Sequence, residues 1–192
     1  MPNLIVISGA PAAGKTTLAR ALRDALGCPL LAKDDFKELL FEELGFSDRA
    51  HSKKLSAAAY AIMFATAKEL AQANQSCILE GNFRWHERQA DFASLAAVPG
   101  LRVLQVFITA DADELARRFE ARAVQRHPGH VDAASAAEII RELRESPARS
   151  LPLAGELIEF RSDVVSPAGT DALIAQVRAW ASSPSPEGRG PG

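Results

Sequence analysis

Residues 9–16 read Gly-Ala-Pro-Ala-Ala-Gly-Lys-Thr, which fits the pattern G-x-x-x-x-G-K-[ST], and the apolar run 4–7 comes directly before them. This pattern, the Walker A motif, predicts a strand, a phosphate-cradling loop and the start of a helix. Gly9 and Gly14 allow the backbone to curl so that several N–H groups point at the phosphates. Lys15 is expected to reach the β- and γ-phosphates, and the Thr16 hydroxyl to ligate Mg²⁺. We therefore expect a bound nucleoside triphosphate, held by Gly9, Ala10, Pro11, Ala12, Ala13, Gly14, Lys15, Thr16 and Thr17.

Strand-like and helix-like patterns alternate along the rest of the chain. Short apolar runs lie near 4–8, 29–32, 77–80, 101–108 and 156–160. Helical patterns occupy about 15–26, 34–44, 53–74, 85–97, 111–126, 134–145 and 168–181. This alternation predicts an α/β fold, with a parallel sheet covered by helices on both faces. Ligands of such sheets bind at the carboxyl ends of the strands, so residues that directly follow a strand become site candidates.

The composition is that of an ordinary globular protein. The chain has 192 residues, of which 47% are hydrophobic and 24% charged, and this size favours a single domain. The net charge of −2 argues against a generalised nucleic-acid-binding or membrane-binding surface. We expect one domain over 1–182 with a lid over about 118–134, followed by a disordered tail rich in Pro, Ser and Gly over 183–192.

The two cysteines, Cys28 and Cys77, form no C-x-x-C pair. They favour a reduced, cytoplasmic protein. A disulfide between them is the less favoured alternative, since each opens a strand and the two strands could be neighbours.

Two adjacent aspartates, Asp34 and Asp35, follow the apolar run 29–32. A kinase needs a carboxylate near the acceptor hydroxyl, to orient it and to take its proton late in the transfer. An aspartate in this place could instead cap the next helix. We assign the base to Asp34, and helix capping or support of the Mg²⁺ shell to Asp35.

The run 77–80 ends in a carboxylate, and Glu80 is followed by Gly, Asn82, Phe and Arg84. At the end of a buried strand, Glu80 is placed to hold a magnesium-bound water or an acceptor hydroxyl. Asn82 and Arg84 are candidate acceptor-binding residues, although Arg84 could equally be a surface residue. The predicted metal ligands are thus Thr16, Asp35 and Glu80, and the predicted acceptor-binding residues are Asp34, Glu80, Asn82 and Arg84.

Three arginines, Arg118, Arg122 and Arg126, are spaced four residues apart on the helix expected over 111–126, so they should share one face. Guanidinium groups that close on the triphosphate would stabilise the transferring group and exclude water. We expect Arg118 and Arg122 to act in this way, as catalytic and nucleotide-binding residues. The alternative is a solvated face on which Glu114 pairs with Arg118.

These motifs together resemble the small P-loop kinases, an AAA-family-ATPase-like group that contains chloramphenicol phosphotransferase, zeta-toxin-like kinases and the kinase domain of polynucleotide kinase. The resemblance spans about residues 3–180 and rests on 9–17, 33–37, 80–82 and the arginine helix with the segment 126–130. Two positions depart from the pattern. Ala12 stands where many of these kinases have a further glycine, and Lys37 stands where polynucleotide kinases carry an arginine.

The resemblance implies a P-loop NTPase fold with a five-stranded parallel sheet in the order 2-3-1-4-5 and a small helical lid. It implies ATP and Mg²⁺ as cofactors, Asp34 as the general base and Glu80 as an acceptor contact. Lid arginines of the group match Arg118 and Arg122, and the adenine is expected near the loop at about 162–167.

Three functions remain open at this point. The favoured one is an ATP-dependent phosphotransferase that acts on a hydroxyl of a small-molecule acceptor. A polynucleotide 5′-hydroxyl kinase is the second, and the acidic balance and scarce aromatic residues speak mildly against it. The third is a nucleotide-dependent regulatory ATPase without an acceptor.

Overall fold

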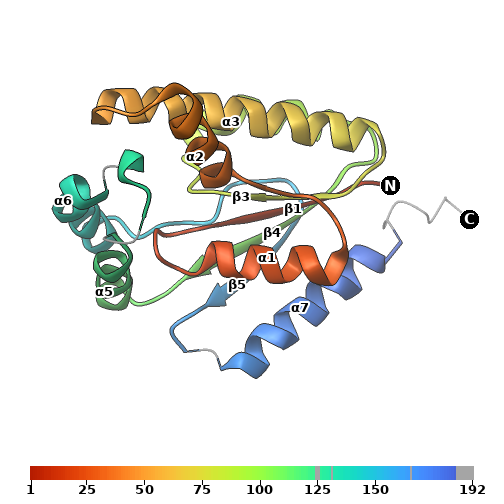
Figure 1. Ribbon diagram of the computed structural model, residues 1–192. Helices are drawn as coiled ribbons and strands as arrows, with labels where there is room; N and C mark the ends of the chain where they lie inside the picture. Colours follow the sequence, from red (N-terminus) through yellow and green to blue (C-terminus); the bar gives the residue numbers. More distant parts are fainter. Residues whose placement is uncertain (124–125, 131, 165, 185–192) are drawn as a thin grey trace, which may run out of the picture.

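The computed structural model describes residues 1–123, 126–130, 132–164 and 166–184 (Figure 1). Its centre is a parallel sheet of five strands in the order β2-β3-β1-β4-β5, as the resemblance implied. The strands are β1 (Asn3–Gly9), β2 (Leu30–Ala32), β3 (Cys77–Glu80), β4 (Arg102–Thr109) and β5 (Glu156–Arg161).

Strand β1 pairs with a neighbour on each side. Ile7 lies opposite Glu80 of β3 and opposite Val106 of β4. In parallel strands this register sets the strand ends at one edge of the sheet, so the loop after β1 opens beside Glu80.

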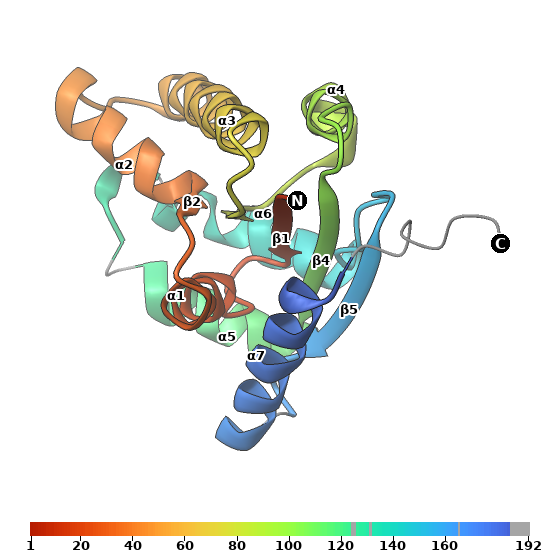
Figure 2. The same ribbon diagram turned by 90° about the vertical axis from the view of Figure 1, so that its right-hand side faces the viewer.

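Helices cover both faces of the sheet, as the alternating pattern predicted (Figure 2). Helices α1 (Lys15–Leu26) and α7 (Pro167–Ser182) pack on one face, and α3 (Arg49–Gln72) and α4 (Trp85–Ala96) on the other. Side chains of a strand point alternately to its two faces. Ile5 and Ile7 accordingly belong to the core under α1 and α7, whereas Leu4 and Val6 belong to the core under α3 and α4.

The remaining elements gather toward the carboxyl ends of the strands (Figure 1). They are α2 (Lys33–Leu44), α5 (Ala112–Ala123), the single 3₁₀ turn η1 (Pro128–His130) and α6 (Asp132–Glu145). Helix α2 continues β2 without a loop, and it packs against α3, while α5 packs against α6.

Three sequence-based expectations need correction. Helix α2 has Ala32 as its N-cap, so the capping role expected for Asp35 is wrong, and that residue lies in the first turn instead. Helix α5 ends at Ala123, so Arg126 does not continue its face. The alternative disulfide is also wrong, because Cys28 and Cys77 are both free thiols.

Residues 185–192 of the expected tail lie outside the described chain. None of the described helices has the length and hydropathy that a bilayer-spanning segment needs.

The start of the phosphate loop is packed directly against β4. Gly9 has a φ of +140°, and a Cβ atom added to it would lie 1.9 Å from the carbonyl oxygen of Ile108. That distance is far shorter than a van der Waals contact. The carbonyl belongs to β4, which is paired with β1 on one side and β5 on the other and so cannot move away. Any side chain at this position would therefore force β1 and β4 apart.

We predict that Gly9→Ala destabilises the protein by more than about 4 kcal/mol, because the new methyl group overlaps the backbone of β4. Gly27→Ala is the control: its φ is +64° but nothing lies within 4 Å of the added Cβ, so the cost is about 1–2 kcal/mol of backbone strain. Urea unfolding of both variants measures the difference. Equal losses of unfolding free energy in the two variants would show that the close approach to β4 is not the reason for a glycine at position 9.

Candidate active site

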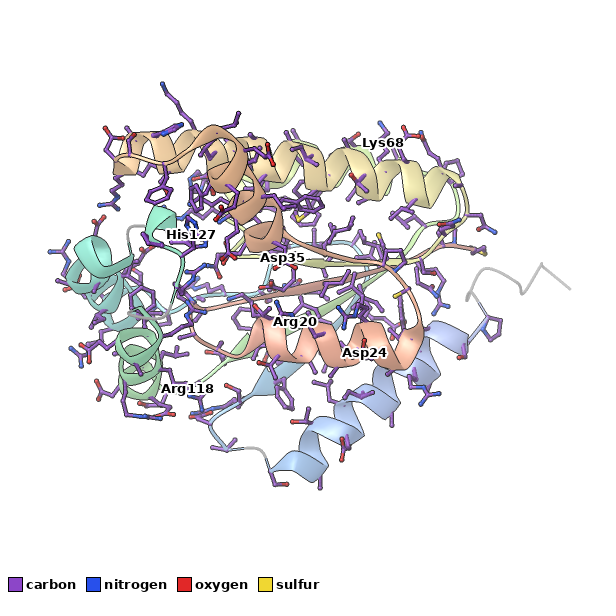
Figure 3. The ribbon with its side chains drawn as sticks, viewed as in Figure 1. Arg20, Asp24, Asp35, Lys68, Arg118 and His127 are labelled. Atoms are coloured by element: carbon purple, nitrogen blue, oxygen red, sulfur yellow. The ribbon has the colours of Figure 1, made fainter. Side chains whose placement is uncertain are left out.

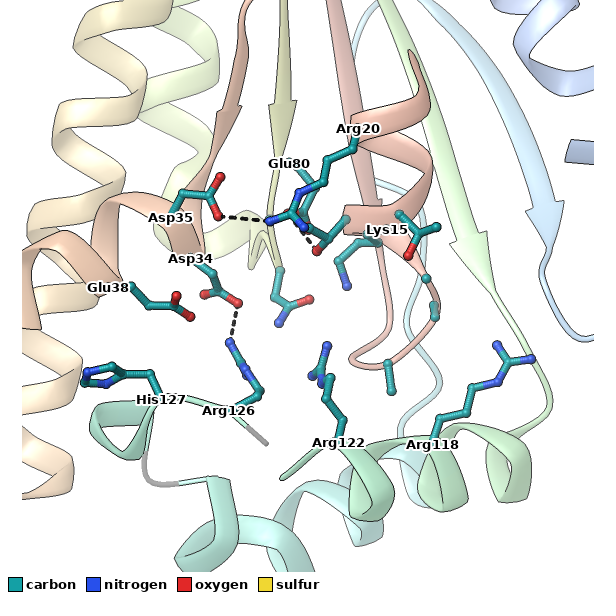
Figure 4. Close-up of a pocket in the computed structure, with 17 residues that line it drawn as sticks. Lys15, Arg20, Asp34, Asp35, Glu38, Glu80, Arg118, Arg122, Arg126 and His127 are labelled. Carbon is teal, nitrogen blue, oxygen red and sulfur yellow. Dashed lines mark hydrogen bonds and ion pairs between the residues drawn. The ribbon is translucent and has the colours of Figure 1, made fainter. Parts of the chain in front are cut away.

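A cavity of about 520 Å³ opens at the carboxyl edge of the sheet (Figure 4). The phosphate loop, α2, the end of β3, α5 and the segment 126–130 each contribute side chains to it. In Figure 3, Arg118 and His127 lie at the end of the molecule that carries α5 and α6, whereas Lys68 lies on a distant part of α3. The lining residues are Ala12, Ala13, Gly14, Lys15, Thr16, Thr17, Arg20, Asp34, Asp35, Glu38, Glu80, Gly81, Asn82, Arg118, Arg122, Arg126 and His127.

The phosphate loop uses left-handed backbone at two positions. Gly14 has a φ of +89° and is the N-cap of α1, while Ala12 has a φ of +62°. A Cβ atom in this region costs about 1–2 kcal/mol. Ala12 thus occupies a conformation that favours glycine, which gives a physical reason for the glycine that many resembling kinases carry there. The curled loop also leaves the N-terminus of α1 open toward the cavity, where backbone N–H groups favour an anion.

Lys15 is buried at the base of the cavity, with 6% of its surface exposed. Its Nζ donates to the carbonyl oxygens of Gly9 at 3.1 Å and Ala10 at 2.7 Å. Burial lowers the pKa of Lys15 to about 8, although the charge of Glu80 opposes the shift. A triphosphate in the cavity would stabilise the charged ammonium, so the site has a cation prepared for an anionic ligand.

Thr16 and Glu80 form the polar pair expected of a magnesium site. Thr16 Oγ1 donates to Glu80 Oε2 at 3.2 Å, and Glu80 is only 5% exposed. Burial raises the pKa of Glu80, while the charge of Lys15 opposes that rise. Mg²⁺ prefers oxygen ligands and commonly combines one or two protein groups with waters and substrate phosphates. A hydroxyl and a carboxylate side by side at the phosphate loop fit that requirement.

Asp35 is less well placed for a metal than Thr16 and Glu80. Its side chain is 54% exposed and lies 3.8 Å from the guanidinium of Arg20 (Figure 4). Within the described part of the chain, no group of three acidic, His or Cys side chains is arranged to hold a metal ion.

Asp34 lies between two cations at the opening of the cavity. Lys33 Nζ donates to Asp34 Oδ1 at 2.8 Å, and Arg126 Nη2 donates to Asp34 Oδ2 at 2.5 Å (Figure 4). Burial alone would raise the pKa of this carboxyl group, but the charges of Lys33 and Arg126 outweigh burial and hold the pKa well below its usual range. Asp34 is therefore ionised at neutral pH, as a proton acceptor must be.

The segment 126–130 is attached to α2 and α3 by polar contacts. His130 Nε2 lies 2.8 Å from Glu38 Oε1, and Ser52 Oγ donates to the carbonyl oxygen of Gly129 at 2.7 Å. Lys37 Nζ in turn donates to Ser52 Oγ at 2.8 Å, within the protein interior. Burial lowers the pKa of His130 to about 3, so its ring is neutral. These contacts hold Arg126 over Asp34.

The α5 arginines lie at the cavity, and one of them also forms the ion pair of the alternative interpretation. Arg118 and Arg122 line the cavity, as expected for nucleotide-binding residues. Arg118 also pairs with Glu114 at 2.7 Å, which was the alternative interpretation, and it donates to Ser162 Oγ at 2.9 Å. That last contact ties α5 to the loop after β5, where the adenine is expected.

The predicted acceptor-binding residues are only partly brought together. Asn82 lines the cavity, and its carbonyl oxygen accepts a hydrogen bond from Tyr60 Oη at 2.9 Å. Arg84 does not line it: its guanidinium pairs with Glu142 of α6 at 3.2 Å and faces a neighbouring cavity.

Three further polar residues of the cavity were not predicted: Arg20, Glu38 and His127. Arg20 could have been found, because it lies four residues after Thr16 on α1 and so shares that residue's face. Glu38 and His127 belong to α2 and the segment 126–130, and the contact between those two elements has no signal in the sequence.

Comparisons with known proteins agree with this geometry. The family model described as an AAA domain matches residues 4–146. A candidate kinase from Chloroflexus aurantiacus J-10-fl is 36% identical, with a TM-score of 0.86 over 93% of this chain and 97% of the other. No curated protein matches the chain significantly.

More distant structures share the fold. A sugar kinase from Janibacter sp. HTCC2649 is 17% identical, with a TM-score of 0.59 over 94% of this chain and 95% of its own. The Mycobacterium tuberculosis APS kinase, solved with AMPPNP and APS, is 19% identical, with a TM-score of 0.63 over 95% of this chain and 98% of its own. The AAA domain match covers most of the chain and the Chloroflexus relative nearly all of it, so the protein belongs to the AAA domain family, as a small P-loop domain of the kinase-like type.

Proposed function

We propose that this protein transfers the γ-phosphoryl group of ATP to a hydroxyl group of a small-molecule acceptor. The observation that carries the proposal is that Lys15, the pair of Thr16 and Glu80, and the ionised Asp34 all line one cavity. A nucleotide switch needs the first two features but has no use for an ionised, half-buried carboxylate in the same cavity.

The transfer uses these groups in defined roles. The acceptor oxygen bonds to the γ-phosphorus, and the bond to the β–γ bridging oxygen breaks, so that ADP leaves with the electron pair. The hydroxyl proton passes to Asp34. Lys15 and the guanidinium groups of Arg118 and Arg122 stabilise the charge on the phosphoryl oxygens, which is the main catalytic demand of a loose transition state.

Arg126 controls when Asp34 is available. Arg126 and Lys33 neutralise the carboxylate and keep its pKa low. When Arg126 turns to a phosphate, it leaves Asp34 with a higher pKa, which makes it a better proton acceptor. We assign residues 118–134 as a lid on this basis, and of these residues 124–125 and 131 lie outside the described chain.

Thr16 and Glu80 would hold Mg²⁺, and Asp35, which lines the same cavity, would support its water shell. When bound, the ion supplies positive charge that neutralises the phosphate oxygens. We assign the adenine to the loop at 162–167, where Ser162 contacts Arg118. Residue 165 of this loop lies outside the described chain. The free thiols of Cys28 and Cys77 support a reducing, cytoplasmic location.

The function is tested by mass spectrometry after incubation with ATP, Mg²⁺ and mixed acceptors: hydroxylated drugs, nucleosides, sugars and 5′-hydroxyl oligonucleotides. We expect one class of small molecule to gain a phosphoryl group, and Lys15→Ala to abolish the transfer. Phosphorylation of the oligonucleotide alone, with binding that weakens as salt rises, would replace the proposal by a polynucleotide kinase. Slow ATP hydrolysis that no acceptor accelerates would favour a regulatory ATPase.

Asp34→Asn should retain ATP binding but slow transfer by about 10²–10⁴-fold, because the amide cannot accept the hydroxyl proton. Single-turnover rates and a separate ATP Kd measure the two effects. Asp24→Asn is the matched control, since Asp24 is exposed on α1, lies outside the cavity lining and pairs with its neighbour Arg23. Near-normal transfer in Asp34→Asn would move the base role to Asp35 or Glu80.

Arg122→Ala should reduce kcat by about 10²–10³-fold while weakening ATP binding much less, because its charge matters most when the phosphoryl group is in transit. Arg117→Ala removes the same side chain from an exposed position of α5, where Arg117 pairs with Glu114, and should leave kcat unchanged. Equal losses of kcat and ATP affinity in Arg122→Ala would identify a ground-state binding residue.

A further inference from the structure

A second cavity, of about 320 Å³, lies on the other side of the phosphate loop. Residues 8–11 line this cavity, whereas residues 12–17 line the first one. Among the described residues, Asn82 lines both cavities. The second cavity therefore adjoins the first at Asn82, two residues after Glu80 at the end of β3.

The walls of the second cavity are largely apolar. Pro11, Phe83 and Ile139 contribute to them, together with the buried side chains of Leu143 and Leu151. Phe83 is held in place by other rings: its centroid lies 5.3 Å from that of Phe92 in an edge-to-face arrangement, and Phe64 and Tyr60 pack against it. An apolar wall made of packed side chains is ordered before any ligand arrives, which reduces the entropy cost of binding.

Charged groups are confined to the rim. Arg84 and Glu142 pair there at 3.2 Å, so that the cation is largely neutralised. Arg149 is exposed on the same rim and forms no ion pair with any described residue. The interior is thus suited to an apolar group, while the rim presents one positive charge to solvent.

We propose that the second cavity binds the body of the acceptor, and that the acceptor is a small alcohol with an aromatic or aliphatic body. This inference rests on the proposed phosphotransferase function and specifies its substrate class. The hydroxyl passes Asn82 to reach Asp34, and the body remains against Phe83 and Leu143. A volume of about 320 Å³ lies at the small end of the range for ligand pockets, which suits a molecule of one or two rings.

Two other acceptor classes fit these walls poorly. A sugar would place several of its hydroxyl groups against the apolar side chains of Pro11, Phe83 and Ile139, where those hydroxyls would lose their bonds to water. The polar lining side chains of Ser8, Asn82 and Ser146 are too few to satisfy them all. A polynucleotide would need a row of cations along its backbone and open stacking platforms. Here Arg84 is paired with Glu142, and Phe83 packs into the wall among other rings.

The test introduces a bulky side chain at the rim of the second cavity. Ala148 lines the cavity from the exposed segment between α6 and β5, so Ala148→Trp places an indole in the binding space without disturbing the core. Ala172→Trp is the matched control, since Ala172 is exposed on α7 and lines neither cavity. Ile139→Asn is a second variant, which replaces an apolar side chain of the wall by a smaller, polar one.

The probes are 2-phenylethanol, 2-(1-naphthyl)ethanol and 1-octanol, compared with glucose and a 5′-hydroxyl oligothymidylate. Binding to the intact protein is measured by saturation-transfer NMR without ATP, and phosphorylation by mass spectrometry with Mg²⁺ and ATP. We expect an aryl or alkyl alcohol to bind and to be phosphorylated. Ala148→Trp and Ile139→Asn should raise its KM at least tenfold, with the ATP Kd unchanged and Ala172→Trp behaving as the unsubstituted protein.

Each contrary outcome identifies what has failed. If none of the three alcohols binds, or if their binding is unaffected by Ala148→Trp, the second cavity is not the acceptor site. If glucose or the oligonucleotide is phosphorylated in their place, the acceptor class is wrong although the protein is a kinase. If the alcohols bind in a manner that Ala148→Trp abolishes, but ATP is neither bound nor consumed, the proposed function fails while the cavity retains its ligand class.

Discussion

The pairing of β1 on both sides is the constraint on which the rest of the structure depends. Because β1 is held by β3 and β4 in a parallel register, its carboxyl end cannot shift relative to Glu80 or Ile108. The close approach of Gly9 to the Ile108 carbonyl follows from this, and so does the position of the loop that begins there. Helix α1 then starts where the loop ends, and its first residues are Lys15 and Thr16. The phosphate site is therefore located by the core rather than by flexible segments.

The active-site cavity contains several charges that the protein interior would normally exclude, and each is compensated locally. Lys15 donates to two backbone carbonyl oxygens, Glu80 accepts from Thr16, and Asp34 is held by Lys33 and Arg126. A triphosphate would exchange with these partners: Lys15 and Arg126 can turn from oxygen atoms of the protein to oxygen atoms of the ligand. A site arranged in this way is stable when empty and still gains interactions when filled.

Much of the fold could be predicted from local signals. The alternation of apolar runs and helical patterns is a property of short segments. It therefore predicted the order of the strands and helices, and it predicted most of their boundaries to within a few residues. Where boundaries moved, a specific local contact was responsible: α3 begins earlier than expected because the Asp48 side chain accepts a hydrogen bond from the His51 backbone N–H. The position of Arg126 was missed because a repeat of four residues continues in the sequence even where the helix has ended.

By itself the sequence determined the phosphate loop, the strand–helix alternation and the carboxylates that follow β2 and β3, because these features depend on residues close together in the chain. Only the tertiary structure decided which charges meet. Arg84 pairs with Glu142, and Arg126 with Asp34, across separations of 58 and 92 residues. It also decided that Asn82 stands between two cavities of different chemistry. The physical reason is that the packing of α5 against α6, and of the segment 126–130 against α2 and α3, sums many weak contacts. No single residue pattern encodes that sum.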